Sequence, residues 1–190
     1  MKNQLKNLIK RREFVAFIGL AVICIAFCFG SPNFPTLYNT MNILRQASIN
    51  AILAVGMTFV IISGGIDLSV GSTVSLSGTI AAIMMVNMGM NVFMGVIGGL
   101  LVGLIIGALN GIIISRLSVP PIIATLGLMT IASGLALAFT GGRSVSGLAD
   151  GFDIFGRGNL GFLPVPVIII VLMYLIGHFT LQKTKFGSSV

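Results

Sequence analysis

Charged residues are scarce in this sequence. They make up 8% of the chain, with four acidic side chains in 190 residues, whereas an average soluble domain is about 25% charged. Hydrophobic residues make up 56% and the mean hydropathy is +1.09. A water-soluble fold of this size has too little interior to hide so much apolar surface. The sequence therefore predicts an all-α, polytopic membrane protein.

Cysteine is scarce as well. Cys24 and Cys28 are the only two, and they lie four residues apart in an apolar run. A zinc site normally needs four ligands, so this pair is interpreted as two small apolar residues. The sequence predicts no metal site and no bound cofactor.

Two catalytic motifs are missing. Without a G-x-x-x-x-G-K-[ST] loop the chain has no cradle for nucleotide phosphates, so a partner must supply any ATP hydrolysis. An intramembrane serine protease would need G-x-S-G, and the nearest stretch begins with Ser75 and continues Leu-Ser77-Gly. His178 is interpreted as an interfacial residue. The sequence thus predicts a non-catalytic membrane subunit.

Basic residues are concentrated at the N-terminus. Five of the eleven lie in the first twelve positions, ahead of an apolar run. This pattern predicts a cytoplasmic flank over residues 1–13 under the positive-inside rule, and not a nucleic-acid surface, which would spread its basic residues over a folded face. No small-x-small cleavage site follows Gly30, so the first helix is expected to be retained.

Charge-free runs predict about six transmembrane helices within one transmembrane domain, residues 1–190. Alternation from a cytoplasmic N-terminus places Arg116, Lys183 and Lys185 inside and Arg45 outside. The predicted segments are residues 14–30, 46–63, 69–87, 91–114, 120–140 and 165–181.

The longest connection is predicted for residues 141–164, on the extracytoplasmic face. It holds Arg143, Asp150, Asp153 and Arg157. Two interpretations stay open: a docking surface for an extracytoplasmic partner, or a solvated loop of balanced charge.

Glycine recurs every fourth residue along the fourth segment. Such small-xxx-small spacing lets another helix approach at backbone distance, so these residues are predicted to pack helices together. Asn110 lies beside them and can bond across helices. The glycines are Gly95, Gly99, Gly103, Gly107 and Gly111.

Asp67 is the one charged residue between Arg45 and Arg116. Gly64 and Gly65 are expected to stop one helix just before it. Asp67 is expected to cap the next helix with its side-chain oxygen, and the rival hypothesis is contact with cargo or a coupling ion. Ser69 and Gly71 complete this predicted helix-break motif.

Hydroxyl and amide side chains follow the break. A helix so polar must face protein or water and not lipid. The predicted lining of a polar pathway is Ser72, Thr73, Ser77, Asn110 and Thr125.

Several motifs together resemble the permease subunit of bacterial ATP-binding-cassette importers for monosaccharides, the ribose, xylose and galactose type. The residues from 120 to 166 are most similar to ribose-type members. The motifs are residues 42–46, 54–61, 64–72, 123–127 and 184–187, which read NILRQ, AVGMTFVI, GGIDLSVGS, IATLG and TKFG.

The resemblance implies a bacterial inner-membrane location and three kinds of partner: cytoplasmic ATP-binding cassette subunits, an extracytoplasmic sugar-binding protein and a second permease copy, most simply forming a homodimer. Members of the family continue past the TKFG motif into a coupling helix and further spans. The chain is therefore expected to be a fragment, a disrupted reading frame or half of a split permease. A secondary transporter of a small polar solute is the alternative function.

Overall fold

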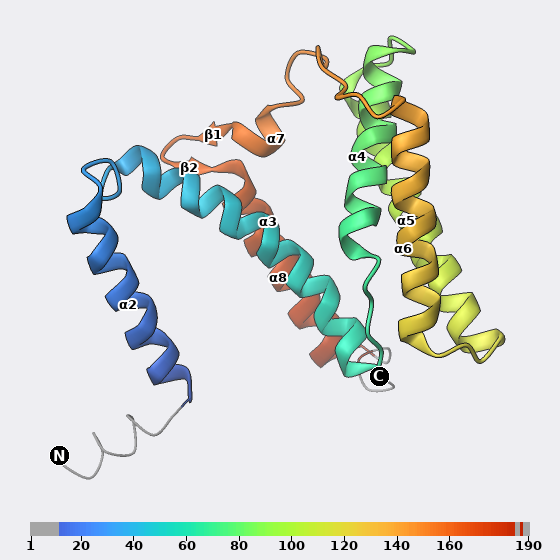
Figure 1. Cartoon of the computed structure of the whole chain (residues 1–190), viewed down its shortest axis with the longest axis horizontal. Coiled ribbons are helices and arrows are strands. Elements are labelled where there is room, and N and C mark those ends of the chain that lie inside the picture. The colour runs from blue at the N-terminus through green and yellow to red at the C-terminus, as the bar shows by residue number, and fades with distance from the viewer. Residues whose placement is uncertain (1–11, 185–186, 188–190) are drawn as a thin grey trace. The chain divides into compact units, whose positions relative to one another are not determined.

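A computed structural model describes residues 12–184 and residue 187. Six helices match the six predicted segments, so the all-α polytopic fold is confirmed (Figure 1). Most of the N-terminal basic flank, and Lys185, lie outside the described residues. The elements are α2 (Arg12–Gly30), α3 (Leu37–Ile62), α4 (Val70–Val86), α5 (Val92–Arg116), α6 (Pro121–Thr140), α7 (Ile154–Arg157), β1 (Asn159–Leu160), β2 (Leu163–Pro164) and α8 (Val165–Lys183).

Four of these helices, α3, α5, α6 and α8, are long and apolar enough to span a membrane. The apolar part of α2 (Phe14–Gly30) and α4 are shorter. At 1.5 Å per residue the 17 residues of α4 extend about 25 Å, less than the roughly 30 Å of hydrocarbon in a bilayer. The non-helical stretch of residues 65–69, which leads into α4 in Figure 1, supplies the remainder.

Helix α3 begins at Leu37, well before the predicted start at residue 46. The Thr36 hydroxyl accepts a hydrogen bond from the Asn39 amide at 3.2 Å, which is N-capping geometry. Polar residues in the first turns hid this start from a hydropathy-based prediction. One of them, Arg45, donates to Asn42 Oδ1 at 2.8 Å within the helix.

The chain divides into two compact units at Gln46, inside α3. In the first unit the rings of Phe27 and Phe34 stack with centroids 5.4 Å apart. The side-chain Nδ2 of Asn39 donates to the Phe34 carbonyl at 3.0 Å. These contacts hold the turn between α2 and α3.

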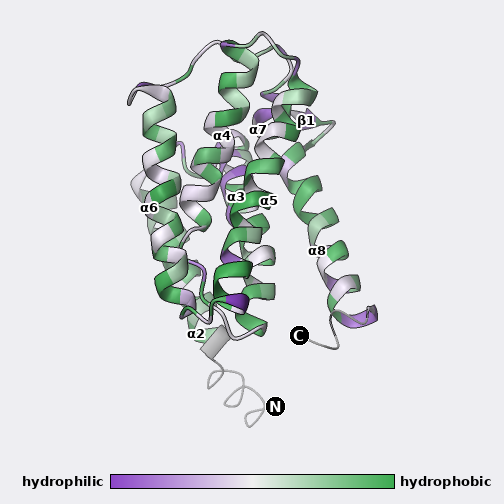
Figure 2. Ribbon diagram, turned by 90° about the vertical axis from the view of Figure 1, so that its right-hand side faces the viewer, coloured by the Kyte–Doolittle hydropathy of each residue, from purple (hydrophilic) through white to green (hydrophobic). Residues whose placement is uncertain are grey.

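In the second unit α4 packs against both α5 and α6. Figure 2 shows hydrophobic residues along much of the length of these helices, as expected for elements that face lipid on one side and protein on the other. Their shared core is a small buried cluster of Leu76, Ile106, Ala132 and Ala136. Helix α6 ends at Thr140 and is followed by the C-cap residue Gly141, which adopts a left-handed conformation with φ of 60°.

The connection over residues 141–164 is more structured than the sequence predicts. It holds the short helix α7 and an antiparallel pair of two-residue strands, in which Asn159 faces Pro164 and Leu160 faces Leu163. Both α7 and β2 pack against α8. Two-residue strands carry no periodicity that a sequence could reveal.

Candidate functional site

The break between α3 and α4 is built by two glycines. Gly64 has a φ of 76° and donates to the Ile61 carbonyl at 3.0 Å. Gly65 donates to the Val60 carbonyl at 2.9 Å. Together these bonds form the Schellman motif that closes many helices. The predicted helix break at these two residues is confirmed.

Asp67 organises the start of α4 from outside the helix. Its Oδ1 accepts from the backbone amide of Ser69 at 2.7 Å and from the Ser69 hydroxyl at 2.6 Å. The N-cap position belongs to Ser69, because its carbonyl accepts the first helical amide, that of Thr73, at 2.8 Å. The expectation that Asp67 itself caps α4 is corrected accordingly: helix α4 begins at Val70, so Asp67 fixes the capping residue instead.

Ser69 is the centre of a buried hydrogen-bond network. The residue is fully buried, with 0% of its surface exposed. Besides the Thr73 amide, its carbonyl accepts from the hydroxyls of Ser72 at 2.8 Å and Thr73 at 2.9 Å. These bonds satisfy the carbonyl of a buried residue that lies outside the regular helix.

Asn110 connects α5 to this network. Its Nδ2 donates to Ser69 Oγ at 2.9 Å, and the side chain is buried. The other amide atom, Oδ1, is buried without a hydrogen-bond partner. The predicted bond of Asn110 across helices is therefore present, and it leaves one acceptor unsatisfied.

Thr125 connects α6 to the same break. It is only 1% exposed. Its hydroxyl donates to the Pro121 carbonyl at 2.9 Å, and the Ile66 carbonyl lies 3.4 Å away. The last turn of α3, the break, α5 and α6 thus meet around one point.

A cavity of about 410 Å³ opens at this point. We name it the Asp67 cavity. It lies at the end of α6 that carries Pro121, the end near Arg116. Its lining consists of Val60, Ser63, Gly64, Gly65, Ile66, Asp67, Gly107, Asn110, Gly111, Ile114, Ser115, Pro121 and Thr125.

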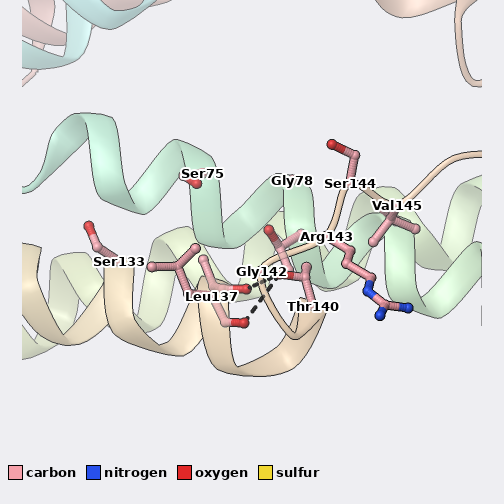
Figure 3. Close-up of a pocket in the computed structure, with 12 residues that line it drawn as sticks. Ser75, Gly78, Ser133, Leu137, Thr140, Gly142, Arg143, Ser144 and Val145 are labelled. Atoms are coloured by element: carbon pink, nitrogen blue, oxygen red, sulfur yellow. Dashed lines mark hydrogen bonds between the residues drawn. The ribbon is translucent and has the colours of Figure 1, made fainter.

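A second cavity, of about 540 Å³, lies between α4 and α6 next to the start of the 141–164 connection. We name it the Arg143 cavity. Figure 3 shows Ser75 and Gly78 of α4 opposite Ser133 and Leu137 of α6, with the residues after Gly142 at one end. Hydroxyl groups dominate its polar lining, from Ser75, Thr79, Ser133, Thr140 and Ser144.

The two cavities lie toward opposite ends of α6. Thr125 lines the Asp67 cavity and Ser133 lines the Arg143 cavity, and eight residues of α-helix separate positions by about 12 Å. Between them along α6 lie Leu128 and Ala132, both buried. A layer of apolar side chains therefore separates the two cavities.

The predicted polar lining is only partly assembled around these cavities. Asn110 and Thr125 line the Asp67 cavity, whereas Ser72, Thr73 and Ser77 line neither cavity. The hydroxyls of Ser72 and Thr73 donate hydrogen bonds to the Ser69 carbonyl instead.

Ser133 was not singled out from the sequence. Ser133 and Thr140 are seven residues apart, which is two helical turns, so they lie on the same face of α6. This spacing is the sequence signal that would have identified the α6 side of the Arg143 cavity.

The glycines that recur every fourth residue in α5, here named the glycine stripe, lie in two different environments. A Cβ at Gly99 would lie 3.0 Å from the Ser77 carbonyl oxygen, and one at Gly95 would lie 2.8 Å from Met85 Cγ, so this half packs directly on α4. At Gly103 the nearest atom is Ser77 Oγ at 3.7 Å. Gly107 and Gly111 have no neighbour within 4 Å and line the Asp67 cavity.

Gly98 also packs against α4, although it lies off the predicted stripe. A Cβ at this position would clash with Met84 Sδ. The close approach of α5 to α4 therefore spreads beyond the four-residue repeat.

His178 and Ser77 belong to different helices, α8 and α4. His178 stacks on Tyr174 within α8, with centroids 6.4 Å apart, while Ser77 faces Gly103 of α5. Among the described residues no three metal-binding side chains come together.

Comparison with known proteins gives one family. The family described as "Branched-chain amino acid transport system / permease component" matches residues 39–190. No solved structure matches the chain.

The named relatives are permease proteins. The ribose import permease protein RbsC of Bacillus subtilis is 45% identical over 173 residues, which are 90% of this chain and 53% of the relative. The protein of the same name in Haemophilus influenzae is 39% identical over 197 residues, 98% of this chain and 60% of the relative. The galactofuranose transporter permease protein YtfT of Escherichia coli is 39% identical over 159 residues, which are 84% of this chain and 44% of the relative. The chain thus spans about half the length of these curated relatives.

Proposed function

Because the chain belongs to the permease-component family of branched-chain amino acid transport systems, we propose that it is a transmembrane permease subunit of an ATP-driven importer for a monosaccharide, with ribose the best candidate. The chain is similar to ribose and galactofuranose permeases. The apolar helices make it a multi-pass membrane protein, and we propose the bacterial inner membrane as its location.

The observation that carries this proposal is a pair of cavities, each with polar groups in its lining, and buried apolar residues between them. A path that is never open to both sides at once needs polar space at each end and a closed section in the middle. The Arg143 cavity offers hydroxyls at one end of α6, and the Asp67 cavity offers a carboxylate and an amide at the other. Movement of α4 against α5 and α6 would open one cavity as it closes the other.

Orientation follows from charge. A cytoplasmic N-terminus places Arg116 and Lys183 inside, at the last turns of α5 and α8. The Asp67 cavity then faces the cytoplasm, and the Arg143 cavity and the 141–164 connection face outward. Sugar would enter beside Arg143 and leave beside Asp67.

An importer of this kind would need three kinds of partner besides this chain. The chain has no phosphate-binding loop, so cytoplasmic ATP-binding cassette subunits would supply ATP hydrolysis. An extracytoplasmic sugar-binding protein would dock near α7 and the 141–164 connection, and a second permease copy would complete the membrane part. No residue of the chain is assigned a catalytic role.

Transport by reconstituted vesicles tests the proposal. A transporter that contains this chain, its ATPase and its binding protein is expected to accumulate radiolabelled D-ribose only when ATP is supplied. A protonophore should leave that uptake unchanged. Uptake that needs a proton gradient and persists without ATP would replace the importer with a secondary transporter.

A further inference from the structure

Two of the three hydroxyl groups that line the Asp67 cavity, those of Ser63 and Thr125, already donate their hydrogens to backbone carbonyls. Ser63 Oγ donates to the Phe59 carbonyl at 2.5 Å, and Thr125 Oγ1 donates to the Pro121 carbonyl at 2.9 Å. A hydroxyl has one hydrogen and two lone pairs, so both groups can now only accept from a ligand.

Asp67 adds further acceptor capacity. An ionised carboxylate accepts and never donates. Both of its described bonds fall on Oδ1, so Oδ2 retains its lone pairs. No basic side chain belongs to the cavity lining among the described residues. Nothing there neutralises or competes for this carboxylate.

The network fixes the orientation of the Asn110 amide. The Ser69 hydroxyl hydrogen is committed to Asp67 Oδ1, because a carboxylate oxygen cannot donate in return. Ser69 Oγ can therefore only accept from Asn110, which must present its Nδ2 to Ser69. Asn110 Oδ1 is left as an acceptor, buried and without a partner.

We propose that the Asp67 cavity is a binding subsite for a neutral, hydroxyl-rich ligand, which is the sugar in transit toward the cytoplasm. One sugar hydroxyl donates to Asn110 Oδ1 and another to Asp67 Oδ2. Since that amide oxygen is closed to water in this conformation, binding opens the cavity wall at α5. This inference rests on the proposed function.

Size and apolar contacts fit the same ligand class. The volume of about 410 Å³ falls within the range of about 300–1,000 Å³ found for small-molecule sites. Val60, Ile66 and Ile114 supply apolar wall for the C–H surface of a sugar ring. A metal cation fits less well, since the lining holds only one carboxylate and hard cations collect several charged oxygens.

Cysteine protection tests the subsite in the assembled transporter. Cys24 and Cys28 are replaced by alanine and Ser115→Cys is introduced as the reporter, because Ser115 lines the cavity and is exposed. Alkylation of this thiol by N-ethylmaleimide is followed by mass spectrometry with D-ribose, with sodium chloride or with neither. Saturating D-ribose should slow the reaction at least twofold, and sodium chloride should not.

Two variants separate ligand binding from structure. Asn110→Leu, close in size but without an acceptor, should abolish protection by ribose. Thr130→Val should retain it, because Thr130 lies in α6 outside both cavities and bonds only within its own helix, to the Gly127 carbonyl at 2.7 Å and the Leu126 carbonyl at 3.3 Å. Unchanged protection in Asn110→Leu would overturn the role of its oxygen.

The comparison of D-ribose with sodium chloride needs only the Ser115→Cys reporter variant. It therefore distinguishes a sugar site from a cation site even where Asn110→Leu fails to assemble. Protection by sodium and not by ribose would overturn the proposal in favour of a cation site. ATP-driven ribose uptake without any protection at position 115 would overturn the subsite and leave the proposed function standing. Absence of ATP-driven ribose uptake would overturn the proposed function, and this inference with it.

Discussion

Two alanine substitutions in the glycine stripe of α5 should have opposite consequences. At Gly99 a new Cβ would lie 3.0 Å from the backbone oxygen of Ser77 and 3.5 Å from Ala81 Cβ. A backbone atom cannot rotate away, so Gly99→Ala must push α5 from α4. At Gly107 the same Cβ meets nothing within 4 Å. Gly107→Ala therefore serves as the matched control.

The expected difference is large enough to measure. Overpacking a tight site typically costs about 1–3 kcal/mol. The gain from replacing a helical glycine by alanine is about 1 kcal/mol, and because both variants receive it, the gain cancels in their difference. Gly99→Ala should therefore be less stable than Gly107→Ala by about 1–3 kcal/mol.

Circular dichroism at 222 nm, followed through an SDS titration in mild detergent, would report the unfolding midpoints of both variants and the parent. Gly107→Ala should match or exceed the parent, and Gly99→Ala should unfold earlier than Gly107→Ala. Equal midpoints, or a more stable Gly99→Ala, would refute the close packing of α5 on α4.

Three further predictions follow from the same structure. Gly64→Ala should lower the free energy of unfolding by about 1–2 kcal/mol, because a left-handed φ of 76° penalises a Cβ, whereas Gly56→Ala in the middle of α3, with open space around it, should be neutral or stabilising in the same titration; equal effects would contradict the role of the turn. Asp67→Asn keeps an oxygen that accepts from the Ser69 amide and hydroxyl and puts an amide donor at the Oδ2 position, from which a sugar hydroxyl can accept instead of donating, so sugar uptake should fall by no more than a few-fold; complete loss of uptake by a folded variant would show that the charge itself is required. Gly103→Leu should reduce assembly of the transporter on size-exclusion chromatography while Gly103→Ala is tolerated, because 3.7 Å to Ser77 Oγ leaves room for one methyl group only; normal assembly of the leucine variant would place this face of α5 against lipid.

Helix positions were largely readable from the sequence because lipid imposes a simple rule. Backbone groups in hydrocarbon must be satisfied internally, so long apolar runs become helices. The prediction failed where the start of α3 is polar, since Asn39, Asn42 and Arg45 lower the hydropathy of a segment that is nevertheless helical. Hydropathy reports contact with lipid, and a helix can extend beyond it.

The helix break was predictable in kind but not in detail. Gly64 and Gly65 predict a stop because only glycine enters the left-handed conformation freely. The first residue of α4 could not be read, because Asp67 and Ser69 are both good capping residues. Tertiary bonds from Asn110 to Ser69 decide between them, and contacts between residues far apart in sequence leave no local pattern.

The cavities were the least predictable feature. Serines and threonines in a membrane helix either bond back to their own carbonyls or face a polar space, and spacing alone does not distinguish these outcomes. Ser72 and Thr73 take the first course, while Ser75 and Ser133 line the Arg143 cavity. The orientation of the chain, the homodimer and the docking role of the 141–164 connection stay predictions.

The central claim is that the two cavities open to opposite sides of the membrane, and one-sided labelling tests it most directly. With Cys24 and Cys28 replaced by alanine, Ser115→Cys reports on the Asp67 cavity and Ser133→Cys on the Arg143 cavity. In sealed, right-side-out vesicles an impermeant thiol reagent added outside should modify the thiol at position 133 and spare the one at position 115 until the vesicles are opened. Modification of both from the same side would contradict the account.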